Sequence, residues 1–86
     1  SYYMDKHYTL WIKSACCFCT KARNKLIEEK LDHTIHIMDD KPEELDKLKE
    51  LWRQKTVPLI VVQEGEEEKF IGGFTDLRDY LQVDDV

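Results

Sequence analysis

The sequence predicts a small α/β domain around a mixed sheet, with its elements in the order βαβαββα. One observation behind this class is that the apolar residues change several times between a period of two and a period near 3.6. A second is the length of 86 residues, which leaves room for one folding unit with one core. Because a strand–helix–strand connection is nearly always right-handed, we expect the first two strands to be parallel neighbours.

The first half of the chain predicts a strand, a helix and a second strand. Residues His7–Lys13 are almost continuously aromatic or branched, which favours a buried central strand. After them the apolar residues recur at helical spacing, so a helix begins at the cysteines. These positions are Cys19, Ala22, Leu26 and Leu31. Residues 33–38 then alternate, with Ile35 and Ile37 on one face, and predict the second strand.

The second half predicts a helix followed by a hairpin. Pro42 suits the first turn of a helix, which we expect to end near Lys55. Its apolar face consists of Leu45, Leu48, Leu51 and Trp52. Two short strands, Leu59–Gln63 and Lys69–Ile71, should pair antiparallel around a turn at Glu64–Glu68.

A short helix should end the chain. Gly72 and Gly73 break the strand pattern, and the apolar residues that follow return to helical spacing. They are Phe74, Leu77, Tyr80 and Leu81. We expect the acidic segment beyond Gln82 to be frayed.

Composition excludes several classes of protein. The residues are 42% hydrophobic and 36% charged, and the longest apolar run, Val57–Val62, is far too short to cross a bilayer. The net charge of -5 has the wrong sign for attraction to phosphate backbones. We therefore expect no membrane and no nucleic acid among the partners. Ser1–Ala15 shows no signal-peptide pattern, so we expect a reducing, cytoplasmic location, where three cysteines need a reason other than a disulfide framework.

The segment Cys16–Cys19 lies between the predicted buried strand and the start of the first helix. A thiol at a helix N-terminus faces unpaired N–H groups and the positive end of the helix dipole, and both favour a sulfur anion. Cys16 is the residue at that point. Because Cys19 lies one turn further on, it can reach back and form a disulfide. The placement predicts a dithiol redox site.

Two other interpretations compete with a redox site. Cys16 and Cys19 with His33 and His36 superficially resemble a zinc finger, but the histidines are separated by two residues where three to five are usual. They also lie in an alternating strand, where residues three apart point to opposite faces. The other interpretation is an inert pair of structural cysteines. For the histidines, His7 included, we favour surface or strand-edge positions.

Four sequence pieces together resemble the glutaredoxin family of the thioredoxin-fold superfamily. They are Lys13 before the cysteines, the Cys16–Cys19 motif, Thr56-Val57-Pro58 and Gly72–Leu77, in family order. The resemblance covers His7 to about Gln82, so we expect residues 1–86 to form a single glutaredoxin domain. It implies a thioredoxin-like fold, a mixed four-stranded sheet flanked by three helices. It also implies a cis peptide before Pro58 and a groove that binds glutathione.

By the resemblance, Cys16 is the nucleophile and Cys19 the resolving thiol. The implied glutathione site consists of Lys13, Phe18, Arg53, Lys55, Thr56, Val57, Pro58, Gly73, Thr75 and Asp76. The Val57 main chain would pair with the glutathione cysteine like an added strand. Thr75 and Asp76 would hold the γ-glutamyl end of glutathione. Lys13 and either Arg53 or Lys55 would meet the glycine carboxylate.

Plain structural explanations stay open for some of these residues. Thr75 is also a good N-cap residue, Asp76 a favourable anion for a first helical turn, and Lys13 a solvated strand end. The charge pattern agrees with an anionic ligand, because Lys6–Lys30 holds six basic and two acidic residues in an otherwise acidic chain. A solvated helix face would give a similar count.

The expected function is glutathione-dependent reduction of protein disulfides and glutathionyl mixed disulfides, with ribonucleotide reductase as one candidate partner. We expect a monomer without a resident metal. The alternative is a [2Fe–2S] carrier in which two chains share a cluster through Cys16 and two glutathiones. The chain departs from the family in having Cys17 where proline is usual and Phe18 where tyrosine is common. We expect Cys17 to be a bystander, because it points elsewhere around the helix.

Overall fold

The computed structural model describes residues 5–84, which form seven elements in the predicted order βαβαββα. The strands are β1 (Lys6–Ile12), β2 (His33–Ile37), β3 (Leu59–Glu64) and β4 (Glu67–Gly72). The helices are α1 (Cys17–Glu28), α2 (Pro42–Trp52) and α3 (Phe74–Asp84). No helix in this described range is long and apolar enough to cross a membrane. The expected fraying beyond Gln82 is wrong for residues 83 and 84, which are helical, and residues 85 and 86 lie outside the described range.

The strands form one mixed sheet in the order β2-β1-β3-β4. Strand β1 is parallel to β2 and antiparallel to β3, and β3 is antiparallel to β4. The predicted central strand and parallel first pair are therefore confirmed. The hairpin is tighter than predicted, because only Gly65 and Glu66 separate β3 from β4 and Gly65 takes a positive φ of 63°.

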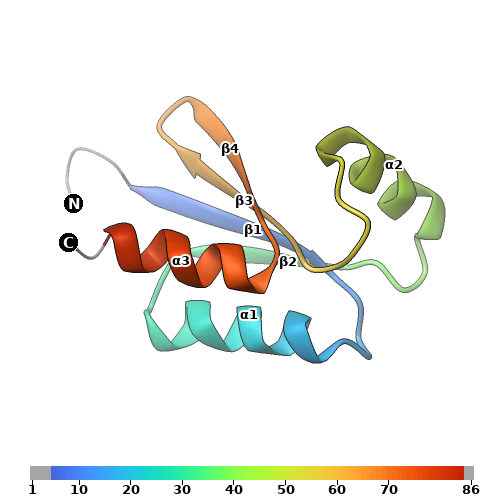
Figure 1. Cartoon of the computed structure of the whole chain (residues 1–86), viewed down its shortest axis with the longest axis horizontal. Coiled ribbons are helices and arrows are strands. Elements are labelled where there is room, and N and C mark those ends of the chain that lie inside the picture. The colour runs from blue at the N-terminus through green and yellow to red at the C-terminus, as the bar shows by residue number, and fades with distance from the viewer. Residues whose placement is uncertain (1–4, 85–86) are drawn as a thin grey trace.

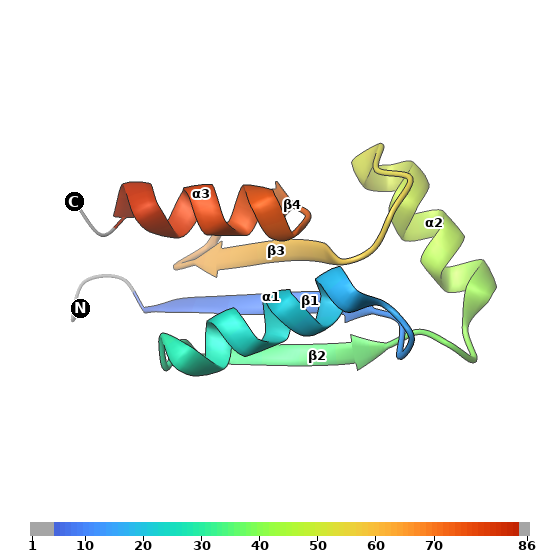
Figure 2. The same ribbon diagram turned by 60° about the horizontal axis from the view of Figure 1, so that its bottom comes forward.

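The helices cover both faces of the sheet. Helices α1 and α3 pack together on one face, whereas α2 lies at one end of the other (Figures 1 and 2). The first core consists of Tyr8, Leu10, Ile12, Cys19, Ala22, Leu26, Ile60, Val62, Leu77 and Leu81. The smaller core beneath α2 consists of Met38, Leu45 and Leu59. Adjacent β3 residues Leu59 and Ile60 enter different cores, as the alternation of a strand requires.

This arrangement brings three segments to one end of the sheet. Helices α1 and α3 both begin at the end where β1 and β2 finish, and the segment from α2 to β3 passes the same end (Figure 2). Two helix N-termini with their unpaired N–H groups therefore lie close to a connecting segment.

Two predicted apolar positions are wrong. Ile37 is 59% exposed and its neighbour Met38 is buried, although the alternation placed Ile37 with the core. Strand β2 is an edge strand that ends at Ile37, and Met38 turns into the small core below α2. Leu51 is 67% exposed, because α2 packs on the sheet with the side that carries Leu45, and Trp52 rather than Leu51 contacts the sheet in its last turn by stacking on Phe70.

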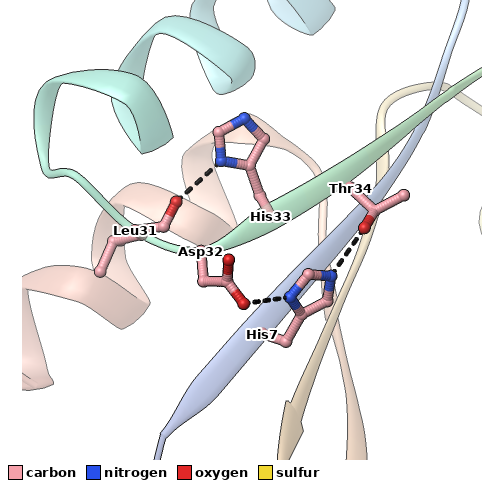
Figure 3. Close-up of polar contacts among 5 residues, drawn as sticks. All are labelled: His7, Leu31, Asp32, His33 and Thr34. Atoms are coloured by element: carbon pink, nitrogen blue, oxygen red, sulfur yellow. Dashed lines mark hydrogen bonds and ion pairs between the residues drawn. The ribbon is translucent and has the colours of Figure 1, made fainter.

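The histidines take part in strand contacts rather than a metal site. The His7 ring lies 2.6 Å from an Asp32 carboxylate oxygen and 2.7 Å from the Thr34 hydroxyl (Figure 3). His33 turns away from this cluster toward a main-chain carbonyl, and His36 stacks on a tryptophan ring of β1. Within the described part of the chain, no three His, Cys, Asp or Glu residues come together in a way that could hold a metal ion.

Candidate active site

Cys16 lies at the N-cap of α1, as predicted. Its backbone is extended, with φ -143° and ψ 111°, and the Cys19 N–H donates to its sulfur at 3.2 Å. The Thr20 N–H donates to the Cys16 carbonyl at 3.1 Å and starts the helical pattern. The first turn carries no acidic residue. The Cys16 sulfur thus lies at the N-terminus of a helix and accepts a hydrogen bond from a backbone N–H.

Cys19 has a very different environment one turn later. Its side chain is only 1% exposed and belongs to the main core. Burial, followed by the hydrogen bond with Cys16, raises the pKa of the Cys19 thiol to about 12, although the Lys13 backbone acts in the opposite direction. Cys17 is exposed, and all three cysteines are free. The accessible sulfur beside the helix N-terminus is suited to attack, and the buried one to a later internal step.

The Val57–Pro58 peptide bond is cis, as the resemblance implied. The Val57 carbonyl lies 3.9 Å from the Cys16 sulfur, so this segment is in contact with the reactive thiol. A groove of about 410 Å³ runs from here to the start of α3. Its lining consists of Phe18, Gln54, Thr56, Val57, Pro58, Gly73, Phe74, Thr75 and Asp76. The groove therefore joins the three segments that meet at this end of the sheet.

Three predicted cations do not line this groove. Arg53 and Lys55 line a neighbouring hollow at the end of α2, which meets the groove at Gln54. Helix α2 ends at Trp52 rather than near Lys55, because Arg53 takes a left-handed conformation with φ 54° and ψ 42°. Lys13 is exposed and lines neither cavity. Among the described residues, Asp76 is the one charged side chain in the lining of the groove.

Asp76 organises the start of α3. The Gly73 N–H donates to its Oδ2 at 2.9 Å, and the Leu77 N–H donates to the Gly73 carbonyl at 3.0 Å, which makes Gly73 the N-cap. Thr75 is thus the second helical residue and not the N-cap that its residue type allowed. Gly72 has a φ of 127°, and a Cβ there would overlap the Asp76 carboxylate. This close approach and the positive φ require glycine at position 72.

The sequence did not single out two residues of the groove. Gln54 donates from Nε2 to the Pro58 carbonyl at 3.3 Å and so ties the end of α2 to the cis-proline segment. The one sequence feature that could have pointed to Gln54 is its position two residues before Thr56. Phe74 was assigned to the apolar face of the last helix, but its ring also lies 6.3 Å from that of Phe18 at the groove. The sequence feature that could have assigned Phe74 to the site is its position within the Gly72–Leu77 motif.

Comparisons with known proteins agree with this fold. Glutaredoxin 1 from Francisella tularensis, solved with cacodylate, superposes with a TM-score of 0.64 at 21% identity, covering 90% of this chain and 93% of that one. The glutaredoxin-like NrdH-redoxin from Escherichia coli gives 0.60 at 20% identity, covering 84% and 92%. These likenesses show a thioredoxin-like fold. No curated protein matches the sequence. A family model of glutaredoxins matches residues 8–66, and the chain therefore belongs to the glutaredoxin family, which consists of thiol–disulfide oxidoreductases.

Proposed function

We propose that this chain uses glutathione to reduce protein disulfides and glutathionyl mixed disulfides. The observation that carries the proposal is the groove that starts beside the Cys16 sulfur, follows the Val57 main chain and ends at the N-terminus of α3. An extended tripeptide with a thiol in its middle and a charged group at each end matches this path. The proposed glutathione site keeps Phe18, Thr56, Val57, Pro58, Gly73, Thr75 and Asp76.

Each part of glutathione has a matching partner in this site. The Val57 main chain would pair with the glutathione cysteine and hold its sulfur near Cys16. The γ-glutamyl end carries an ammonium group for the Asp76 carboxylate and a carboxylate for the first N–H groups of α3. The glycine carboxylate would extend past Gln54 toward Arg53 and Lys55 in the adjoining hollow.

The reaction with a glutathionyl mixed disulfide needs only Cys16. Its thiolate attacks the glutathione sulfur, the bond to the substrate protein breaks, and the protein sulfur leaves as a thiolate that takes up a proton. A second glutathione thiolate then attacks the glutathione sulfur now bonded to Cys16. Glutathione disulfide is released and the Cys16 thiolate is restored. Two electrons have passed to the substrate, which has become a thiol.

Reduction of a protein disulfide also uses Cys19. Attack by Cys16 joins the substrate to the enzyme, and the Cys19 thiol, after losing its proton, displaces the substrate as a dithiol. The resulting Cys16–Cys19 disulfide is reduced by two glutathiones. On the family resemblance we retain ribonucleotide reductase as a candidate partner. We also propose a monomer that works in the cytoplasm.

The choice of reductant tests the proposal. Reduction of a glutathionylated peptide and of a small disulfide should proceed with glutathione, glutathione reductase and NADPH, and the Cys16→Ser variant should be inactive in the same assay. Turnover with thioredoxin reductase but not with glutathione would overturn the glutathione assignment while leaving the dithiol chemistry intact. A visible spectrum of anaerobically purified protein with sulfide-to-iron bands would instead favour the [2Fe–2S] carrier.

A further inference from the structure

Asp39 contacts the turn that leads into the reactive cysteine. It lies just after β2, and its Oδ1 accepts the Ser14 backbone N–H at 2.9 Å across a sequence separation of 25 residues. The Ser14 side chain also hydrogen-bonds to it. Both bonds, the backbone one first, hold the pKa of the Asp39 carboxyl below its ordinary value. The contact is therefore made by an ionised carboxylate at neutral pH.

The turn between β1 and α1 touches the dithiol on its other side. It consists of Lys13, Ser14 and Ala15, and it separates the last residue of β1 from the N-cap residue Cys16. The Lys13 backbone interacts with the Cys19 thiol. A displacement of Ser14 is thus transmitted through two peptide bonds to the reactive sulfur. Lys13 and Ser14 are both exposed, so packing holds this turn less firmly than the strand before it.

We propose that Asp39 is a positioning residue that fixes the turn at Ser14 and thereby keeps the Cys16 sulfur at the N-terminus of α1. The inference rests on Cys16 being the nucleophile of the proposed function. It does not depend on which reductant restores the enzyme. Asp39 acts through the backbone of Ser14 and lines neither the groove nor the hollow beside it.

Positioning and simple electrostatics predict opposite effects when Asp39 is neutralised. A negative carboxylate near the site disfavours a second negative charge on sulfur, so its removal alone should increase the reactivity of Cys16. Loss of the bond to the Ser14 N–H should reduce that reactivity, because the sulfur would no longer be held near its backbone donor. The direction of the change therefore separates the two causes.

The test measures alkylation of Cys16 by iodoacetamide at neutral pH in a Cys17→Ser background, which removes the exposed neighbouring thiol. Asp39→Ala should slow the reaction by about tenfold, less than the hundredfold that a displacement of one ångström can cost. Asp39→Asn keeps a carbonyl oxygen that can accept the Ser14 N–H, so it should recover most of the rate. Asp40→Ala removes the same charge one residue later and should not slow the reaction.

Several results would overturn the proposal. One is an alkylation rate in Asp39→Ala that is unchanged or higher. The others are an alkylation rate that falls in Asp39→Asn, or in Asp40→Ala, as much as it falls in Asp39→Ala. In the unaltered protein, the Ser14 and Cys16 amide resonances should shift together as acid protonates Asp39, which tests the inference if Asp39→Ala does not fold. A Cys16 amide resonance that does not shift while Asp39 is protonated would contradict the proposal. Because alkylation needs no glutathione, a failure here is distinct from a failure of the proposed reductant.

Discussion

The buried Cys19 thiol makes closure of the internal disulfide strongly dependent on pH. With a pKa of about 12, only about one molecule in 10⁵ has a Cys19 thiolate at pH 7. That fraction grows tenfold for each pH unit until the pKa is approached. We therefore expect the rate at which Cys19 attacks a glutathionylated Cys16 to rise about a hundredfold between pH 7 and pH 9.

Glutathionylation of Cys16 changes some of the causes behind the Cys19 pKa. The hydrogen bond and the charge of Cys16 both raise that pKa in the reduced protein, and both change once Cys16 carries glutathione. Burial is the largest cause and remains, because Cys19 stays in the core between α1 and the sheet. The Cys19 pKa in the intermediate should thus lie below about 12 but above the ordinary value of 9.0.

Mass spectrometry can follow this step directly. Reduced Cys17→Ser protein is mixed with one equivalent of glutathione disulfide, and the glutathionylated intermediate is quenched with acid at a series of times and pH values. Its decay to the internal disulfide gives the closure rate, and Cys19→Ser is the control that cannot close. A rate that levels off below pH 9 would refute the reasoning, because it would give Cys19 the acidity of an exposed thiol.

Three further predictions concern the nucleophile, the groove and the start of α3. Cys16→Ser should abolish glutathione-coupled turnover, whereas Cys19→Ser should keep deglutathionylation of a peptide; equal loss in both would contradict the division of roles. Asp76→Asn should raise the KM for glutathione about tenfold through loss of a charge-assisted bond, and Lys13→Ala, outside the groove, less than about fivefold. If neither changed the KM, the proposed site would be wrong. Gly72→Ala should lower the free energy of unfolding by about 1–3 kcal/mol in urea titration, because its φ of 127° and the nearby Asp76 carboxylate exclude a Cβ; an unchanged midpoint would show that the helix start can relax.

Much of the fold could be predicted because local patterns determine it. The helical spacing of Cys19, Ala22 and Leu26 matches the buried face of α1, and the order of the elements together with the handedness of a crossover gives the parallel β1–β2 pair. Exposure was less predictable. Ile37 and Leu51 have the residue type of a core, but Ile37 lies at the end of an edge strand and Leu51 on the outer side of α2, and both positions depend on the tertiary arrangement.

The site was predictable to the extent that its residues lie in continuous motifs. The Cys16–Cys19 motif and the cis-proline segment are short continuous motifs in the sequence, and the structure brings them together. The bond from Ser14 to Asp39 joins residues 25 positions apart, and no local pattern marks it. Gln54 was missed for a related reason. Its contact with the Pro58 carbonyl requires α2 to end at Trp52, and a left-handed Arg53 is not evident from residue type.

The different roles proposed for the cysteines follow from helix geometry over a single turn. Cys16 at the N-cap keeps an extended backbone and receives the Cys19 N–H, Cys17 in the next position turns to solvent, and Cys19 turns into the core. Successive residues of a helix are rotated by about 100° about its axis, so neighbouring thiols cannot share one environment. The first turn of α1 thus gives the Cys16 sulfur a backbone N–H donor and places the Cys19 thiol in the core, where burial raises its pKa. Cys17 lies between them in the sequence and is exposed, and we predict that it takes no part in exchange with either cysteine.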